Sequence, residues 1–202
     1  YLPALIGGIP VSAFGSAFHA CTAITEFEVS PENAMLCTLD GVLFSKDMTT
    51  LLRYPNLRDG TYTIPDGVTD AENAFKNCRW LTSLTIPDSV TGDMGTFDGC
   101  DSLHEINGEF YVSTGVDLNH CLRLKNLHLA ASDEITDPHF GYLLCDGNTT
   151  LEHVTIGKNC IINDELRFRD CPLLKTLDFT ECTANGRLTE LILSDCDALT
   201  SI

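Results

Sequence analysis

Short stretches of the chain repeat one pattern of apolar and polar positions, L-x-x-[LIV]-x-[LIF]. The pattern occurs at residues 81–86, 124–129, 151–156, 174–179 and 188–193. Its last positions alternate between apolar and other residues, which predicts a short strand with one buried face. From these anchors and similar runs we expect strands near residues 26–29, 42–45, 51–54, 61–64, 83–86, 104–107, 125–129, 152–156, 175–179 and 189–193.

A second motif, F-x-x-C-x-x-[LI], recurs with the strand pattern. Ile64–Thr69 and the motif that follows it both return 22 residues later. A period of about 20–29 residues is typical of one coil of a solenoid, in which each coil buries its apolar face only against its neighbours. We expect the motif to form short helical or 3₁₀ turns on the face opposite the strands. Its copies, one of which has Leu for Phe, contain Cys21, Cys78, Cys100, Cys121 and Cys171.

The spacing of the repeat leucines becomes irregular towards the end of the chain. Successive intervals from Leu81 are 22, 21, 27 and 23 residues as far as Leu174, and the last two are 14 and 11. The last two are too short for whole coils. The sequence therefore predicts either a narrowed or capping end, or a register of the final copies that differs from this assignment.

The unit built from Ile-Pro-Asp-x-Val-Thr, Ala-Phe-x-x-Cys and Leu-Thr-x-Leu-x-Ile resembles the BspA-like, or Treponema-type, leucine-rich repeats. Residues 40–55 look like the β-hairpin insertion common in that family. The resemblance is strongest over residues 18–106, and residues 107–202 read as more divergent repeats. It implies one leucine-rich-repeat domain over residues 1–202. That domain would be a solenoid with a parallel β-sheet on one face, short helices or 3₁₀ turns and loops on the other, and the hairpin insertion.

Charge excludes one class of partner. The chain has 12 Lys and Arg against 29 Asp and Glu, a net charge of −17, so phosphate backbones and anionic lipid surfaces would repel it. With 44% hydrophobic residues it still has the composition of a folded protein.

The apolar stretch at residues 1–20 contains Pro3, Gly7, Gly8 and Pro10, so we expect neither a membrane span nor a signal peptide in it.

The ten cysteines suggest packing more than chemistry. Five of them share the F-x-x-C position, so we predict that they stack as a ladder of buried free thiols. No C-x-x-C pair exists, which argues against a zinc ribbon or a thioredoxin-like site. Cys37, Cys145 and Cys160 lie off the ladder and are the expected sites of oxidation or an occasional disulfide.

We predict no catalytic residue, no cofactor and no metal site, and hence no enzyme. The six histidines, at positions 19, 104, 120, 128, 139 and 153, form no H-E-x-x-H pair. The acidic pairs Asp98 with Asp101 and Asp195 with Asp197 lack the order of an EF-hand loop and read as solvated turn residues. Asn148 begins a glycosylation sequon that we take to be incidental.

A solenoid offers a surface instead. The strand residues between the leucines point away from the core, and successive coils align them in rows. These rows are polar and carry no aromatic stripe, so they predict either a protein-binding face or a solvated face with no specific role. The predicted protein-binding residues are Glu105, Asn107, Asn126, His128, His153, Thr155, Asp178 and Glu190.

The predicted function is a non-enzymatic protein-interaction module. The family resemblance implies a bacterial cell-surface or secreted adhesin that binds host matrix proteins such as fibronectin or fibrinogen, or another cell. Nucleic acid and direct membrane insertion are not expected. Two alternatives remain open: a structural spacer in a larger surface protein, and an intracellular scaffold, which ten unpaired thiols would suit. The ligand, the oligomeric state and the flanking domains are not predicted.

Overall fold

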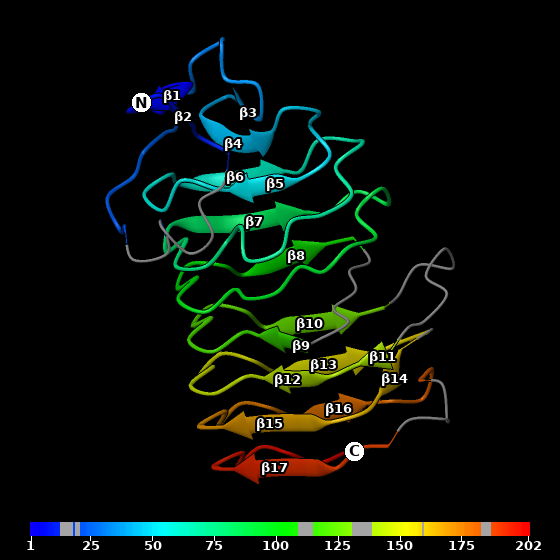
Figure 1. The fold of residues 1–202 in the computed structure, drawn as a ribbon. Coiled ribbons are helices and arrows are strands. Elements are labelled where there is room, and N and C mark those ends of the chain that lie inside the picture. Colours follow the sequence, from blue (N-terminus) through cyan, green and yellow to red (C-terminus); the bar gives the residue numbers. More distant parts are fainter. Residues whose placement is uncertain (13–17, 19–20, 109–114, 131–138, 159, 183–186) are drawn as a thin grey trace.

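The strands stack into a solenoid with two faces (Figure 1). The structure, a computed structural model, describes residues 1–12, 18, 21–108, 115–130, 139–158, 160–182 and 187–202. Of the six histidines, His19 lies outside the described residues. The repeats form a β-solenoid of about five turns with parallel sheets. One apolar core runs through it from Val42 to Leu177.

The front face consists of two parallel three-stranded sheets that follow one another along the solenoid axis (Figure 1). We call them together the front sheet. Its strands match the apolar alternation predicted from the sequence. They are β6 (Gly60–Thr63), β7 (Leu81–Thr85) and β8 (Glu105–Asn107), followed by β10 (Asn126–Leu129), β13 (His153–Ile156) and β16 (Thr176–Asp178).

The opposite face of the second half is also a parallel sheet, which corrects the expectation of helices there. We call it the back sheet, and its strands run against those of the front sheet (Figure 1). In β15 the buried Leu166 and Phe168 alternate with the more exposed Glu165, Arg167 and Arg169, the pattern of a half-buried strand. The strands are β9 (Gly115–Asp117), β12 (Tyr142–Leu144), β15 (Glu165–Arg169) and β17 (Glu190–Ser194).

The described residues contain no helix, so the predicted helical or 3₁₀ turns are wrong for this part of the chain. In the coil that leads into β7, the Cys78 N–H donates to the Phe75 carbonyl at 3.1 Å, and this hydrogen bond closes a single turn. Asn77, just before the cysteine, has φ of 59°. This left-handed conformation stops a helix from continuing. Residues in the same place in later coils share it: Gly99, His120, Gly147, Asp170 and Asp195.

The last strand was assigned to the wrong sheet. The expected front strand at 189–193 is β17, whose Leu191 pairs with Leu166 of the back sheet. Alternation is the same in a front and a back strand, so the leucine spacing alone could not distinguish them. The next front segment is instead Ser201, which bridges Thr176 after the Leu199 N–H closes a turn on the Cys196 carbonyl.

The first residues fold differently from the repeats. Strands β3 (Leu36–Leu39), β4 (Val42–Ser45) and β5 (Leu51–Arg53) form an antiparallel sheet, and β1 (Leu5–Ile6) pairs antiparallel with β2 (Ile9–Pro10). Two further short strands, β11 (His139–Phe140) and β14 (Ile161–Ile162), pair in parallel. The strand expected at 26–29 is reduced to one bridge from Val29 to Leu2.

Arg53 joins the antiparallel sheet to the first regular coils. Its side chain is 2% exposed, and its Nη1 donates to the carbonyl oxygens of Asn73 and Ala74 at 3.1 and 3.3 Å. Asn56 donates from Nδ2 to the carbonyls of Lys76 and Asn77, both at 3.1 Å. These charged and polar donors satisfy turn carbonyls that the burial of this junction removes from water.

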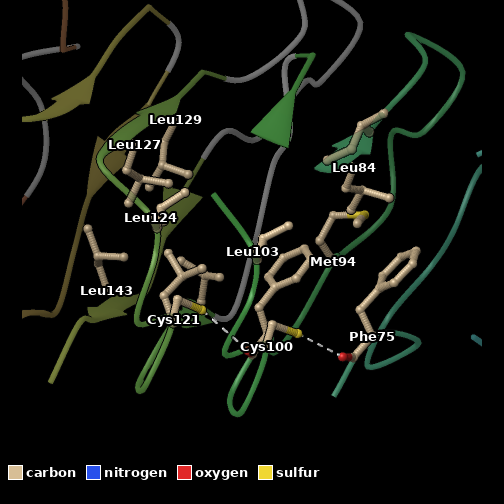
Figure 2. Close-up of a cluster of buried hydrophobic side chains, with 14 of the residues drawn as sticks. Phe75, Leu84, Met94, Cys100, Leu103, Cys121, Leu124, Leu127, Leu129 and Leu143 are labelled. Atoms are coloured by element: carbon tan, nitrogen blue, oxygen red, sulfur yellow. Dashed lines mark hydrogen bonds between the residues drawn. The ribbon is translucent and has the colours of Figure 1, made fainter. Parts of the chain in front are cut away.

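Adjacent coils are also linked by thiols (Figure 2). The Cys100 thiol donates to the Phe75 carbonyl at 3.1 Å and the Cys121 thiol to the Phe97 carbonyl at 3.5 Å. Each acceptor lies three residues before the residue of the preceding coil that corresponds to the cysteine; Phe75, for example, lies three residues before Cys78. We define the thiol ladder as Cys78, Cys100, Cys121, Cys171 and Cys196, which all make this bond. Cys21 was predicted to belong to it, but it is exposed.

Asn148 occupies the ladder position in one coil and breaks the ladder. Its side chain is fully buried, and neither its Nδ2 nor its Oδ1 has a hydrogen-bond partner in the described structure. Unpaired buried polar atoms cost free energy. The free energy of unfolding of the Asn148→Cys variant is therefore expected to be about 1–3 kcal/mol higher than that of wild type.

Chemical denaturation followed by circular dichroism measures this change. The matched control is Thr149→Cys, which adds a thiol at the adjacent exposed position and should leave stability within about 0.5 kcal/mol of wild type. An Asn148→Cys protein no more stable than wild type would show that the amide is not a misfit in the ladder.

Candidate functional site

Seven of the eight predicted binding residues lie in two kinds of row on the front sheet. Strand pairing aligns Asn126 with His153 and then Thr176 in one row, and His128 with Thr155 and then Asp178 in the other. On the first three strands the same rows contain Ser83 with Glu105 and Thr85 with Asn107. Glu105, Asn107, Asn126, His128 and His153 are exposed, and Thr155 and Asp178 are half-buried. Seven of the eight predicted residues thus share one face.

Glu190 does not belong to this face. It begins β17 and pairs with Glu165 of the back sheet, so its assignment to the front rows is wrong. Two carboxylates directly opposite each other disfavour the pairing of their strands. Arg167 offsets this, because its Nη1 lies 3.4 Å from the Glu165 carboxylate.

Contacts within the front rows link neighbouring coils. Ser83 donates from Oγ to the Glu105 carboxylate at 3.1 Å, and His153 Nδ1 lies 2.8 Å from Thr176 Oγ1. At the start of the strands, Lys175 forms an ion pair with Glu152, which lowers the pKa of that carboxyl through the hydrogen bond and the charge. The rows are thus polar, and hydrogen bonds link neighbouring coils within them.

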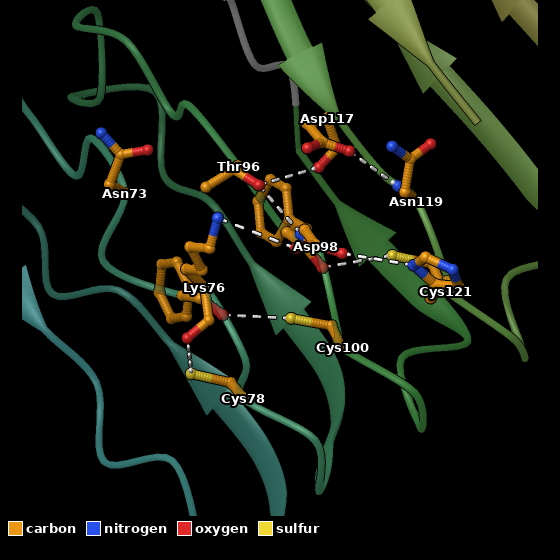
Figure 3. Close-up of polar contacts among 12 residues, drawn as sticks. Asn73, Lys76, Cys78, Thr96, Asp98, Cys100, Asp117, Asn119 and Cys121 are labelled. Atoms are coloured by element: carbon orange, nitrogen blue, oxygen red, sulfur yellow. Dashed lines mark hydrogen bonds and ion pairs between the residues drawn. The ribbon is translucent and has the colours of Figure 1, made fainter. Parts of the chain in front are cut away.

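Acidic turn residues have basic side chains as partners (Figure 3). Asp98 lies 3.7 Å from Lys76 Nζ and 3.4 Å from His120 Nδ1, and Asp101 lies 2.8 Å from Arg79 Nε. Within the described residues no cluster of three or more His, Cys, Asp or Glu side chains could hold a metal ion. The asparagine of the sequon, Asn148, is fully buried in the folded chain.

The back sheet carries polar residues that sequence reasoning missed. Arg167 donates from Nε to Asp146 at 2.8 Å, and burial raises the pKa of the nearby Asp117 carboxyl. The Tyr142 ring lies over Gly115, where a Cβ would come within 2.5 Å of the ring. The alternation of apolar and charged residues at 165–169 could have predicted this strand. The F-x-x-C motif that overlaps it was instead interpreted as a turn.

Thiol chemistry is suppressed by burial. Burial raises the pKa of both Cys78 and Cys171 to about 12, and that of the half-buried Cys182 to about 11. Cys145 and Cys160, which were expected to be open to oxidation, are buried, whereas Cys37 is partly exposed. No disulfide joins any of the ten cysteines, all of which the structure describes.

The described part of the chain contains no helix that is long and apolar enough to cross a membrane.

A family model described as "BspA type Leucine rich repeat region" matches residues 15–143 in six copies. No curated protein matches the chain. Among solved structures, a leucine-rich repeat protein from Eubacterium ventriosum matches with 24% identity and a TM-score of 0.61, covering 88% of this chain and 47% of its own. A leucine rich cell surface protein from Faecalibacterium prausnitzii matches with 22% identity and a TM-score of 0.57, covering 81% and 44%. The chain thus spans less than half the length of either structure.

Burial predicts which thiols react. At pH 8 a thiol of pKa about 12 is a thiolate in roughly one molecule in ten thousand, and the thiolate is the nucleophile. After brief treatment of the native protein with iodoacetamide, we expect the fastest labelling at the exposed Cys21 and slower labelling at the partly exposed Cys37, Cys182 and Cys196. No label is expected at the buried Cys78, Cys100, Cys121, Cys145, Cys160 and Cys171. Mass spectrometry of peptides locates the label, and denatured protein, in which all ten should react, is the control. Label at Cys100 as fast as at Cys21 would contradict the buried ladder.

Proposed function

Because the chain belongs to the BspA type leucine-rich-repeat family, we propose that it is a non-enzymatic protein-interaction module. The observation that supports this is the front sheet, where polar side chains from successive coils align in rows within each of its two three-stranded sheets. A repeated surface of this kind suits an extended contact with a macromolecule. Specificity would come from the side chains of the rows, because the backbone is the same from coil to coil.

We further propose that the protein acts at a bacterial cell surface or as a secreted adhesin. One structure with the same fold is described as a cell surface protein, and this supports the location. The partner would be a host matrix protein or another cell surface. A net charge of −17 favours partners that present basic patches, and attraction of this kind weakens as salt is added.

One observation favours a structural spacer as the second candidate. The front rows carry neither Trp nor Tyr nor Arg, which are the side chains most enriched at interface hot spots. In a spacer the front sheet would be solvated, and the repeats would only hold other domains apart. The two candidates differ in whether a change of the front rows alters any binding.

A binding panel of fibronectin, fibrinogen and other matrix proteins, measured by surface plasmon resonance at several salt concentrations, tests the proposal. The test variant combines Glu105→Lys, His128→Glu, His153→Glu and Asp178→Lys. We expect its affinity for at least one partner to be at least tenfold lower than that of wild type, because the substitutions change the pattern of charge along the front rows. The partner should also bind more weakly at higher salt.

The matched control combines Asp66→Lys, Asp88→Lys, Thr69→Glu and Thr91→Glu, which change the net charge equally on exposed loops after β6 and β7. This control should change affinity less than twofold. Binding that both variants weaken alike would indicate a general charge effect. A folded protein that binds nothing at any ionic strength would favour the spacer.

A further inference from the structure

Two sulfur atoms meet at the antiparallel sheet near the N-terminal end of the solenoid (Figure 1). The Cys37 Sγ lies 3.4 Å from the Met48 Sδ, and both side chains are partly exposed. Cys37 belongs to β3, and Met48 lies in the turn that joins β4 to β5. A thiol and a thioether are the soft donor atoms that copper(I) prefers among protein ligands. We call these two residues the sulfur pair.

The turn fixes the backbone from which Met48 reaches Cys37. The Asp47 carboxylate accepts hydrogen bonds from Ser45 Oγ at 2.7 Å and from Thr49 Oγ1 at 2.8 Å. The Met48 N–H donates to the Ser45 carbonyl at 3.0 Å. Within this turn Met48 has φ of 62°, a left-handed conformation that is uncommon for a long side chain. The contact between the sulfurs is therefore made from a defined turn and not from a loose loop.

A third sulfur lies on the same side of the sheet. The Met35 carbonyl accepts the Lys46 N–H at 2.8 Å, which continues the ladder between β3 and β4 by one residue. Residues two apart along a strand point to the same side, so Met35 and Cys37 share a face. The Met35 side chain is 52% exposed and is free to change its rotamer.

A surface pocket of about 380 Å³ adjoins the sulfur pair. It is lined by Ala34, Met35, Ser45, Lys46 and Asp47. The Cys37 thiol donates to the carbonyl of Ser45 at 3.1 Å, so the thiol lies next to the pocket wall. Lys46 and Asp47 are both exposed and opposite in charge, so their effects on an entering cation offset each other. A metal ion can thus reach the pair from solvent.

Other partly exposed cysteines lack this arrangement. The thiols of Cys182 and Cys196 donate to backbone carbonyls at 3.0 and 3.5 Å, and neither has a sulfur partner in the part of the chain that the structure describes. The chain has three methionines, of which two lie beside Cys37 and the third, Met94, is fully buried. The accessible sulfur ligands are therefore concentrated at one place.

We propose that Cys37 and Met48 bind a soft monovalent metal ion such as copper(I), with Met35 as the third ligand. Because the thiolate is the ligand form of cysteine, the thiol proton passes to solvent as the ion binds. The thiolate then neutralises the charge of the ion, and the thioethers add neutral donors. Calcium and magnesium prefer oxygen ligands and are not held here. This site is separate from the front sheet, so it is independent of the proposed function.

Competition with a chromophoric copper(I) chelator tests the site on the reduced full chain without oxygen. We expect one ion per chain to be bound more tightly than any other. Cys37→Ala should abolish this tight site, and Met48→Leu should weaken it at least tenfold, because leucine keeps the apolar volume but removes the thioether. Met35→Leu should weaken it less. Matched controls are Cys182→Ala and Met94→Leu, which should change the affinity less than twofold.

A labelling experiment locates the ion. One equivalent of silver(I), a soft ion that does not change its oxidation state here, should protect Cys37 from iodoacetamide and leave Cys182 reactive, as measured by mass spectrometry of peptides. Thermal unfolding checks that every variant folds. Tight binding that Met48→Leu leaves unchanged would show a lone thiol and overturn the proposal. Protection of Cys182 in place of Cys37, or no ion held against the chelator, would overturn it too, and none of these results bears on the proposed function.

Discussion

In five coils of the solenoid, a hydrogen bond from a thiol to a backbone carbonyl of the preceding coil reinforces the stack. The acceptor carbonyl, such as that of Phe75, already closes its own turn by accepting the Cys78 N–H, and it receives the Cys100 thiol as well. Each bond therefore ties one turn to the next. The front and back strands on either side of these turns pair in register.

This constraint divides the surface into parts with different chemistry. Side chains at the ladder position point inward and are thiols in five coils and the Asn148 amide in another, and the residues that follow them in the turns are more exposed. Polar residues follow in some coils, and Trp80, Leu122 and Leu173 follow in others. The front rows remain polar.

The sequence predicted the solenoid because a repeat period and an alternating strand are both visible in one chain. Seven of the eight residues predicted to lie on the front face do lie there, because L-x-x-L-x-L marks which side chains point outward. It failed for Glu190, since the same alternation describes a back strand, and only strand pairing tells the two apart. It failed for the helical turns because the left-handed φ of Asn77 and its equivalents is invisible in the spacing.

The central claim is that the ladder thiols stabilise the stack as hydrogen-bonded groups in a fully packed interior. The most direct test is the free energy of unfolding of the Cys100→Ala variant, measured by chemical denaturation. Loss of the sulfur removes both the bond to the Phe75 carbonyl and the packing of a fully buried side chain, so a decrease of about 1–3 kcal/mol is predicted. A free energy equal to that of wild type would contradict this account.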